Sequence, residues 1–73
     1  MVRVLIALVD GVVARGFRAM LDEAEDCTCA AVVQEIEDIR EAVEEQTPAV
    51  VLMDVAFRRA DAELLPDLLA LDP

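Results

Sequence analysis

Three short apolar runs, separated by amphipathic stretches, constrain the fold of this chain more than any other feature. The runs cover residues 2–9, 27–33 and 49–54. Continuous apolar runs of this length are typical of strands buried on both faces of a parallel sheet. Parallel strands need long connections that are usually helical, and the intervening stretches are long enough to supply them. The pattern predicts one α/β domain with the order β-α-β-α-β-α and three strands.

The stretches between and after these runs have helical periodicity. Residues 12–25, 34–46 and 61–71 are the expected helices, and residues 55–60 are expected to form a loop. The second helix should end at Thr47 because Pro48 disfavours helix in the residue before it, and Pro66 lies near the start of the third, where it is tolerated. The first helix is expected to turn one apolar face to the core, made of Val12, Val13, Gly16, Phe17, Met20, Leu21 and Ala24. The apolar positions of the second are Ile36, Ile39, Ala42 and Val43, and those of the third are Leu64, Leu65, Leu68, Leu69 and Leu71.

Composition excludes several classes of function. Six basic residues against 16 acidic ones leave a formal net charge of -10, which argues against binding to nucleic acid or to an anionic membrane. No apolar run is long enough for a transmembrane helix, and the first run has no secretory cleavage site, so we expect a cytoplasmic protein. Histidine, serine and lysine are absent, which removes the usual catalytic triads and Schiff-base chemistry. The composition predicts that the chain is not an enzyme.

Two cysteines, Cys27 and Cys29, lie one residue apart in the second apolar run. On a strand their Cα atoms would be about 6.6–6.8 Å apart, at the outer limit for a disulfide. A structural zinc site needs four nitrogen or sulfur ligands. We therefore interpret them as reduced, buried apolar residues on the core side of a strand, which fits a cytosolic protein.

Two carboxylates, Asp10 and Asp54, come at the ends of the first and third runs. Ligand sites of parallel α/β sheets lie at the carboxyl ends of the strands, so these two side chains are expected to approach each other. Asp10 is also a candidate cap for the helix that follows it.

Four segments, in this order and spacing, resemble the N-terminal half of a response-regulator receiver domain of the LuxR/NarL type. Residues 2–7 resemble the opening strand of that family, and residues 13–21 (VARGFRAML) resemble its VREGLRALL helix. Residues 47–54 (TPAVVLMD) resemble RPDVVLMD, the strand with the phosphorylated aspartate, and residues 69–73 (LALDP) resemble LRALDP. The resemblance implies a three-layer, flavodoxin-like fold in which residues 1–73 form a partial receiver domain of a two-component phosphorelay. It places Asp54 at the phosphoacceptor position.

The chain departs from this family where the family binds magnesium. The two adjacent acids that hold Mg²⁺ in typical receivers correspond to Leu8 and Val9. Asp54, Asp10 and the backbone carbonyl of Ala56 remain, which is a poor magnesium site, so no cofactor is expected. The family's MPG loop is replaced by Phe57-Arg58-Arg59, whose arginines either attract a phosphoryl group or are simply solvated. The family's switch Ser/Thr and its lysine correspond to positions beyond Pro73.

These observations leave two functions open. The first is an atypical receiver, impaired in phosphorylation, that responds to protein contacts or a ligand. A histidine kinase is then an expected partner, and DNA is bound only through a C-terminal domain outside this chain. The second is a standalone dimerisation module, because the strand order 2-1-3 implied by the family leaves the third strand as an apolar edge that can pair with a second copy.

Asp54 is correspondingly a phosphoacceptor, a vestigial site or a plain strand-end cap. The acidic helix of residues 34–46 either recruits a basic partner or is a solvated face.

Overall fold

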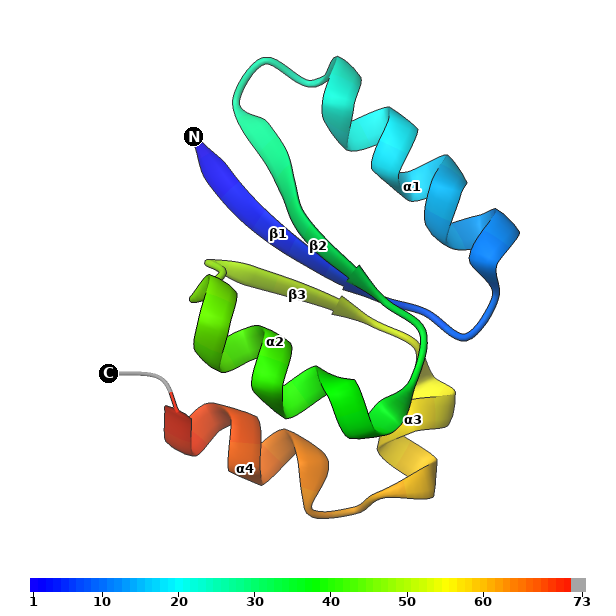
Figure 1. The fold of residues 1–73 in the computed structure, drawn as a ribbon, viewed down its shortest axis with the longest axis vertical. Coiled ribbons are helices and arrows are strands. Elements are labelled where there is room, and N and C mark those ends of the chain that lie inside the picture. The colour runs from blue at the N-terminus through cyan, green and yellow to red at the C-terminus, as the bar shows by residue number, and fades with distance from the viewer. Residues whose placement is uncertain (72–73) are drawn as a thin grey trace.

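The chain folds into a three-stranded parallel sheet with helices on both faces, as the α/β pattern predicted (Figure 1). The computed structural model describes residues 1–71, and all of their side chains except those of Arg58, Leu65, Leu69, Ala70 and Leu71. The first half contains β1 (Val2–Ala7), α1 (Gly11–Glu23) and β2 (Cys27–Val33). A 3-10 turn (Ile36–Asp38) then leads into α2 (Ile39–Gln46). The remaining elements are β3 (Val50–Met53), α3 (Val55–Ala60) and α4 (Leu64–Leu71).

Strand β1 is the centre of the sheet, and β2 and β3 are its two edges. Both pairings are parallel; Val4 of β1, for example, lies opposite Cys29 on one side and Val50 on the other. The backbone of the central strand is therefore bonded on both sides, and its residues from Val4 to Ala7, together with Leu8 just after it, are all buried. The edge position predicted for the third strand is confirmed.

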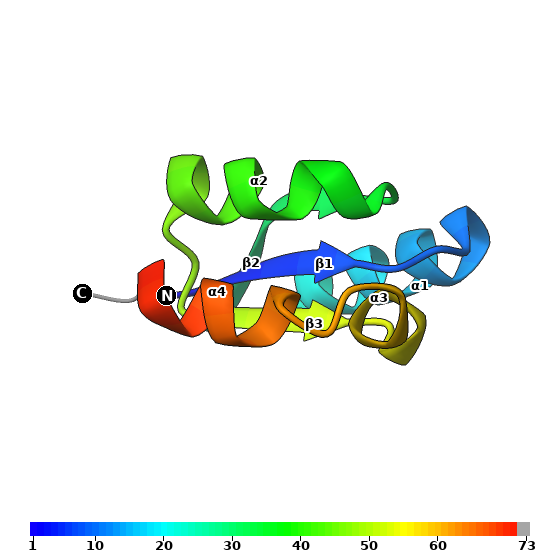
Figure 2. The same cartoon turned by 90° about the horizontal axis from the view of Figure 1, so that it is seen from below.

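The side chains of alternate residues of β1 belong to two separate hydrophobic clusters, one on each face of the sheet. Leu5 and Ala7 face α2, α3 and α4, where they join Val33, Ile39, Phe57, Leu64 and Leu68. Val4, Ile6 and Leu8 face the opposite side, where Ala14 of α1 packs on them. Figure 2 shows α2 along one side of the strands. The result is the expected three-layer arrangement with a parallel sheet in the middle.

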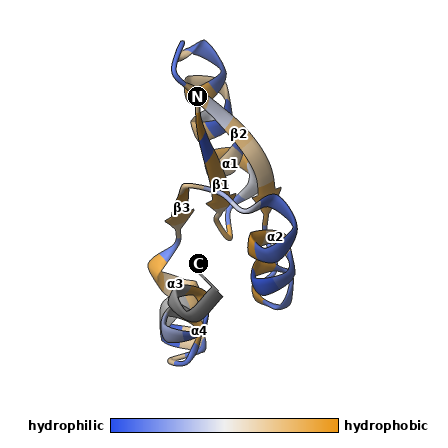
Figure 3. Cartoon of the chain, turned by 90° about the vertical axis from the view of Figure 1, so that its left-hand side faces the viewer, coloured by the Kyte–Doolittle hydropathy of each residue, from blue (hydrophilic) through white to orange (hydrophobic). Residues whose placement is uncertain are grey.

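Helix α2 confirms the amphipathic stripe predicted within residues 34–46, but the predicted helix start at residue 34 is wrong, because Glu35 is extended and the α-helix begins at Ile39 after the 3-10 turn. Ile39 is fully buried, and Ile36, Ala42 and Val43 pack against the same cluster. Figure 3 shows much of the rest of α2 as hydrophilic, in contrast to the apolar strands. The helix ends at Gln46, and Thr47 follows in the left-handed conformation, with φ 42°, directly before Pro48.

The loop predicted for residues 55–60 is wrong, because these residues form the short helix α3. Asp54 caps its first turn through its side chain, and Phe57 is buried in the main cluster. The cap and the buried aromatic ring together stabilise a turn of helix that periodicity over six residues cannot reveal. The last helix begins at Leu64 instead of residue 61, since Asp61 Oδ1 accepts a hydrogen bond from Glu63 N (3.0 Å) in the preceding turn.

The face of α1 that was predicted to meet the core is also wrong. Ala14 is the buried residue of this helix, and Leu21 and Ala24 are half-buried. The other members of the predicted face are exposed: Val12, Val13, Gly16, Phe17 and Met20. The helix packs mainly on β2 and β1, and the side that contains Ala14 and Leu21 faces the sheet. The neighbouring apolar side chains of the predicted face are therefore left uncovered.

Among residues 1–71, none of the helices is both long and apolar enough to cross a membrane.

Candidate functional site

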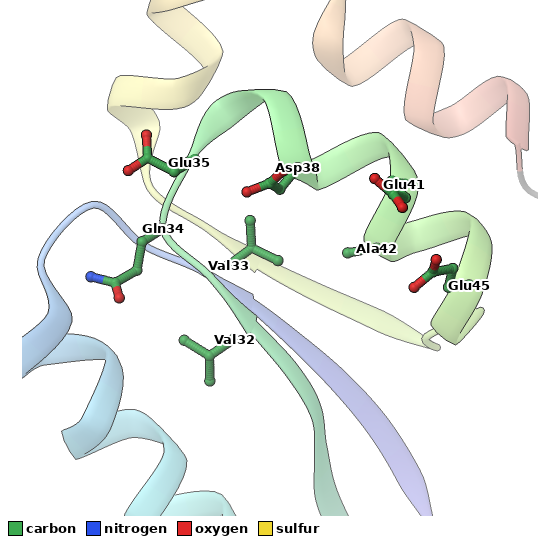
Figure 4. Close-up of a pocket in the computed structure, with 8 residues that line it drawn as sticks. All are labelled: Val32, Val33, Gln34, Glu35, Asp38, Glu41, Ala42 and Glu45. Atoms are coloured by element: carbon green, nitrogen blue, oxygen red, sulfur yellow. The ribbon is translucent and has the colours of Figure 1, made fainter.

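The carboxyl edge of the sheet has a polar side chain after each of its three strands. Asp10 follows β1, Gln34 follows β2 and Asp54 follows β3. The two aspartates were predicted here, whereas Gln34 was missed because it carries no charge and belongs to no periodic pattern. Figure 4 shows the Gln34 amide turned toward the start of α1. A Cβ atom at Gly11 would lie 2.8 Å from Gln34 Nε2, so the glycine gives this amide its room.

Asp10 is the N-cap of α1, as its place before the helix predicted. Its Oδ1 accepts hydrogen bonds from Val12 N (2.8 Å) and Val13 N (3.3 Å), and its carbonyl accepts one from Ala14 N (3.0 Å). The carboxylate thus satisfies backbone N–H groups that have no partner within the helix, and its negative charge lies at the positive end of the helix dipole. This oxygen is already engaged in stabilising the fold.

Asp54 has the same task at the start of α3. Its Oδ1 accepts a hydrogen bond from Ala56 N (3.0 Å), and its carbonyl accepts one from Phe57 N (3.1 Å). Its own N–H donates to the carbonyl of Ala7 (2.8 Å), which continues the β3–β1 ladder by one residue. The side chain is half-buried at the edge where the resemblance places a phosphoacceptor.

Leu8 lies at the level of Asp54, and the resemblance matches it to an acid of the receiver family. The Ala7–Asp54 hydrogen bond puts Leu8, the residue after β1, at the level of Asp54, and Leu8 N donates to the carbonyl of Val33 (3.1 Å) on the other side. Leu8 is only 8% exposed and belongs to the cluster under α1, while Val9 is exposed. An apolar side chain offers no oxygen to a hard cation.

No three histidine, cysteine or acidic side chains gather closely enough to hold a metal ion among the residues that the structure describes. Asp10 and Asp54 each direct one carboxylate oxygen to helix N–H groups. Ala56, the third suggested ligand, lies in the first turn of α3 and donates its N–H to Asp54. Arg59 is exposed on this helix, and the side chain of Arg58 lies outside the described part. The weak magnesium affinity of this edge stays a prediction.

An acidic groove of about 450 Å³ runs between the end of β2 and the adjacent side of α2 (Figure 4). Val33 and Ala42 supply its apolar lining, Val32 borders it with its side chain on the other face of the sheet, and Gln34 lies at one end. The carboxylates along it belong to Glu35, Asp38, Glu41 and Glu45. The groove is open and its four carboxylate residues are exposed, so both interpretations of the acidic helix, a surface for a basic partner and a solvated face, stay predictions.

Arg40 connects α2 to the last helix through an ion-pair cluster. Its Nη2 donates to Asp61 Oδ2 (3.0 Å) and to Asp67 Oδ2 (2.7 Å), and its Nε donates to Asp67 Oδ2 (3.2 Å). The hydrogen bonds to Asp67 and Asp61 raise the pKa of Arg40 above its ordinary value. The pKa of Asp61 is lowered, first by the hydrogen bond from Arg40 and then by that from the backbone N–H of Glu63.

Cys27 and Cys29 are both free, as predicted, but half-buried and not buried. Cys29 packs against the cluster under α1, and Cys27 Sγ donates to Asp26 Oδ1 at 3.7 Å. The difference arises because β2 is an edge strand with a neighbour on one side only.

Comparisons with family models, with curated proteins and with solved structures give no match to this chain.

Proposed function

We propose that this chain is an atypical receiver-like signalling module that works through protein contacts and not through magnesium-dependent phosphorylation of Asp54. One observation carries the proposal. The buried side chain of Leu8 lies at the level of Asp54, at the edge of the sheet where a receiver needs an acid. The parallel sheet with the order β2-β1-β3 supports the receiver-like part of the proposal.

The chemistry of phosphoryl transfer explains why it matters that Leu8 stands where a receiver has an acid. Negative charge spreads over the phosphoryl oxygens in the transition state, and Mg²⁺ neutralises part of it. Magnesium requires near-octahedral oxygen coordination, with one or two carboxylates beside water. Here the side chain of Leu8 supplies no oxygen, and one oxygen of Asp54 accepts the Ala56 N–H. Asp54 is therefore proposed as a vestigial phosphoacceptor that serves as a helix cap.

Intact-mass measurement after incubation with an acyl phosphate and Mg²⁺ tests the proposal. We expect no gain of a phosphoryl group on the wild-type chain. The Asp54→Asn variant is the matched control, because asparagine also caps a helix and the fold is retained. A phosphoryl gain on the wild type that is absent in Asp54→Asn would contradict the proposal.

Self-association is the second candidate function, and the exposure of β3 favours it. Among residues 1–71 this strand pairs with β1 and with no other strand, and Val50 is 48% exposed. Free strand edges with apolar side chains readily pair with another chain, so a homodimer is the simplest partner. Light scattering at tens of micromolar should give a mass above the 8.0 kDa of one chain. A monomer mass would exclude this candidate.

The other expected partners follow from the main proposal. A histidine kinase would contact the module without transferring phosphate to it. DNA binding is not assigned to residues 1–73, because their net charge of -10 repels the phosphate backbone. The two free thiols support the proposed cytoplasmic location.

A further inference from the structure

Helix α1 exposes more apolar surface than a helix on the outside of a monomer needs. Val12 is 77% exposed and Met20 is 65% exposed, and Val13 and Phe17 are exposed beside them. Among residues 11–20, the residues with polar side chains are Arg15 and Arg18. With 100° between successive residues, the arginines share one flank of the helix, whereas apolar residues occupy the sheet-facing side, the opposite flank and the outer surface as far as Met20; Glu23 ends the outer surface.

The hand of the fold shows which flank is apolar. A crossover between parallel strands is right-handed in nearly all proteins, and the α-helix is right-handed as well. With α1 connecting β1 to β2, this handedness directs Val13 and Phe17 toward the β3 side and Arg15 toward the β2 side. The apolar flank therefore faces the part of the sheet where Val50 is exposed and Leu52 is half-buried.

We propose that a second copy of this chain docks on this face, so that the two α1 helices lie side by side between the two sheets. In this arrangement the outer surface of each α1 covers the exposed part of the partner's sheet, and the β3-side flank contacts the other helix. A helix that is apolar on three sides is what such a buried layer requires. Gly16, with nothing within 4 Å of its ideal Cβ position, allows close approach on the outer surface. The inference rests on the self-association proposed above and names a surface other than the strand edge.

Charge distribution permits this contact in spite of the net charge of -10. The acidic residues of α1 are confined to its last two positions, Asp22 and Glu23, whereas six acidic residues lie between residues 35 and 45 on the opposite layer of the molecule. Two copies that meet through α1 thus keep their acidic helices on the outside of the dimer. Repulsion between the copies is then long-range and is screened by salt.

The surface area is consistent with a missing contact. The chain exposes 4968 Å², whereas a compact monomer of 8.0 kDa is expected to expose about 4,450 Å². The excess of about 500 Å² is surface that a compact monomer of this size usually buries, and the exposed apolar side chains of α1 contribute to it.

Sedimentation equilibrium of the full chain and three variants tests the inference. Val12→Glu and Met20→Lys place opposite charges on the exposed apolar surface, each at the end of α1 where the helix dipole favours its sign. Arg15→Gln is the control, because it changes the net charge by the same amount as Val12→Glu but lies on the polar flank. We expect the wild type and Arg15→Gln to dimerise, more tightly at 0.5 M than at 0.05 M salt. Both surface variants should remain monomeric up to at least tenfold higher concentration, with an unchanged far-UV circular dichroism spectrum.

Results that contradict the expectation distinguish the α1 interface from the β3 edge and from the phosphorylation proposal. A wild type that stays monomeric at hundreds of micromolar contradicts both forms of self-association and leaves the phosphorylation result unaffected. A dimer that persists in Val12→Glu and Met20→Lys excludes the α1 face and leaves the β3 edge as the interface. Loss of the dimer in Arg15→Gln as well would show that the apolar surface is not what holds the copies together, and would overturn the inference.

Discussion

Asp10 contributes to stability as a cap and has no partner other than the start of α1 among the contacts described. Replacing it by alanine removes the acceptor of the Val12 and Val13 N–H groups. We expect Asp10→Ala to lower the free energy of unfolding by about 1 kcal/mol, and Asp10→Asn to lower it by much less, because asparagine also caps helices. Urea denaturation measures both. Equal losses in the two variants would mean that the charge matters and the cap does not.

Thr47 stores backbone strain at the end of α2. It has φ 42°, a left-handed conformation that is unfavourable for a β-branched residue and common for glycine at this position. Its N–H donates to the carbonyl of Val43 (2.9 Å), a bond that glycine retains. Thr47→Gly is therefore expected to raise the free energy of unfolding by up to about 1 kcal/mol. Thermal unfolding of Thr47→Gly beside Thr28→Gly, a strand position where glycine should destabilise, gives the comparison.

At the scale of elements, the Arg40 cluster connects α2 to the turn before α4 and to α4 itself. The pKa of Asp61 is lowered in the folded state by Arg40, so its contribution to stability is present above the ordinary carboxyl pKa of about 3.9 and is lost as the pH falls through the lowered value. We expect Arg40→Gln to reduce Tm slightly at pH 7, because the pair is solvent-exposed, and to reduce it less at pH 3.

The same pH series on Arg15→Gln is the control for that prediction, since the structure shows no ion pair of Arg15 among the described residues. If the difference between wild type and Arg40→Gln does not shrink toward low pH, the ion pair is not the source of the stabilisation.

At the scale of the whole molecule, the excess of acidic over basic residues opposes the compact state. The net charge of -10 is carried by a chain of 73 residues, and raising the salt from 0.01 to 0.15 M shortens the Debye length from about 30 to about 8 Å. Tm is therefore expected to rise by a few degrees over this range. The measurement is best made on Val12→Glu, in which self-association should not contribute. Near pH 4.1, the sequence pI, the salt effect should largely disappear.

Local patterns in the sequence were enough to predict most of the architecture. The three strands, the start of α1 at Asp10 and the end of α2 before Pro48 all follow from side-chain pattern, capping and proline sterics, which act over a few residues. The third apolar run also placed Asp54 at the carboxyl end of β3, and the resemblance to receivers led to the edge position of that strand.

Contacts between distant segments decided the rest. Helix α3 exists because Phe57 reaches a cluster built by β1, β2, α2 and α4, and Arg40 meets Asp61 and Asp67 across more than twenty residues of sequence. The periodicity of α1 identified an apolar sector but could not say which part of it a three-stranded sheet covers. The sequence by itself determined that α1 is amphipathic; only the tertiary structure decided that Ala14 is buried while Val12 and Met20 are exposed, because burial depends on where the helix lies over the sheet.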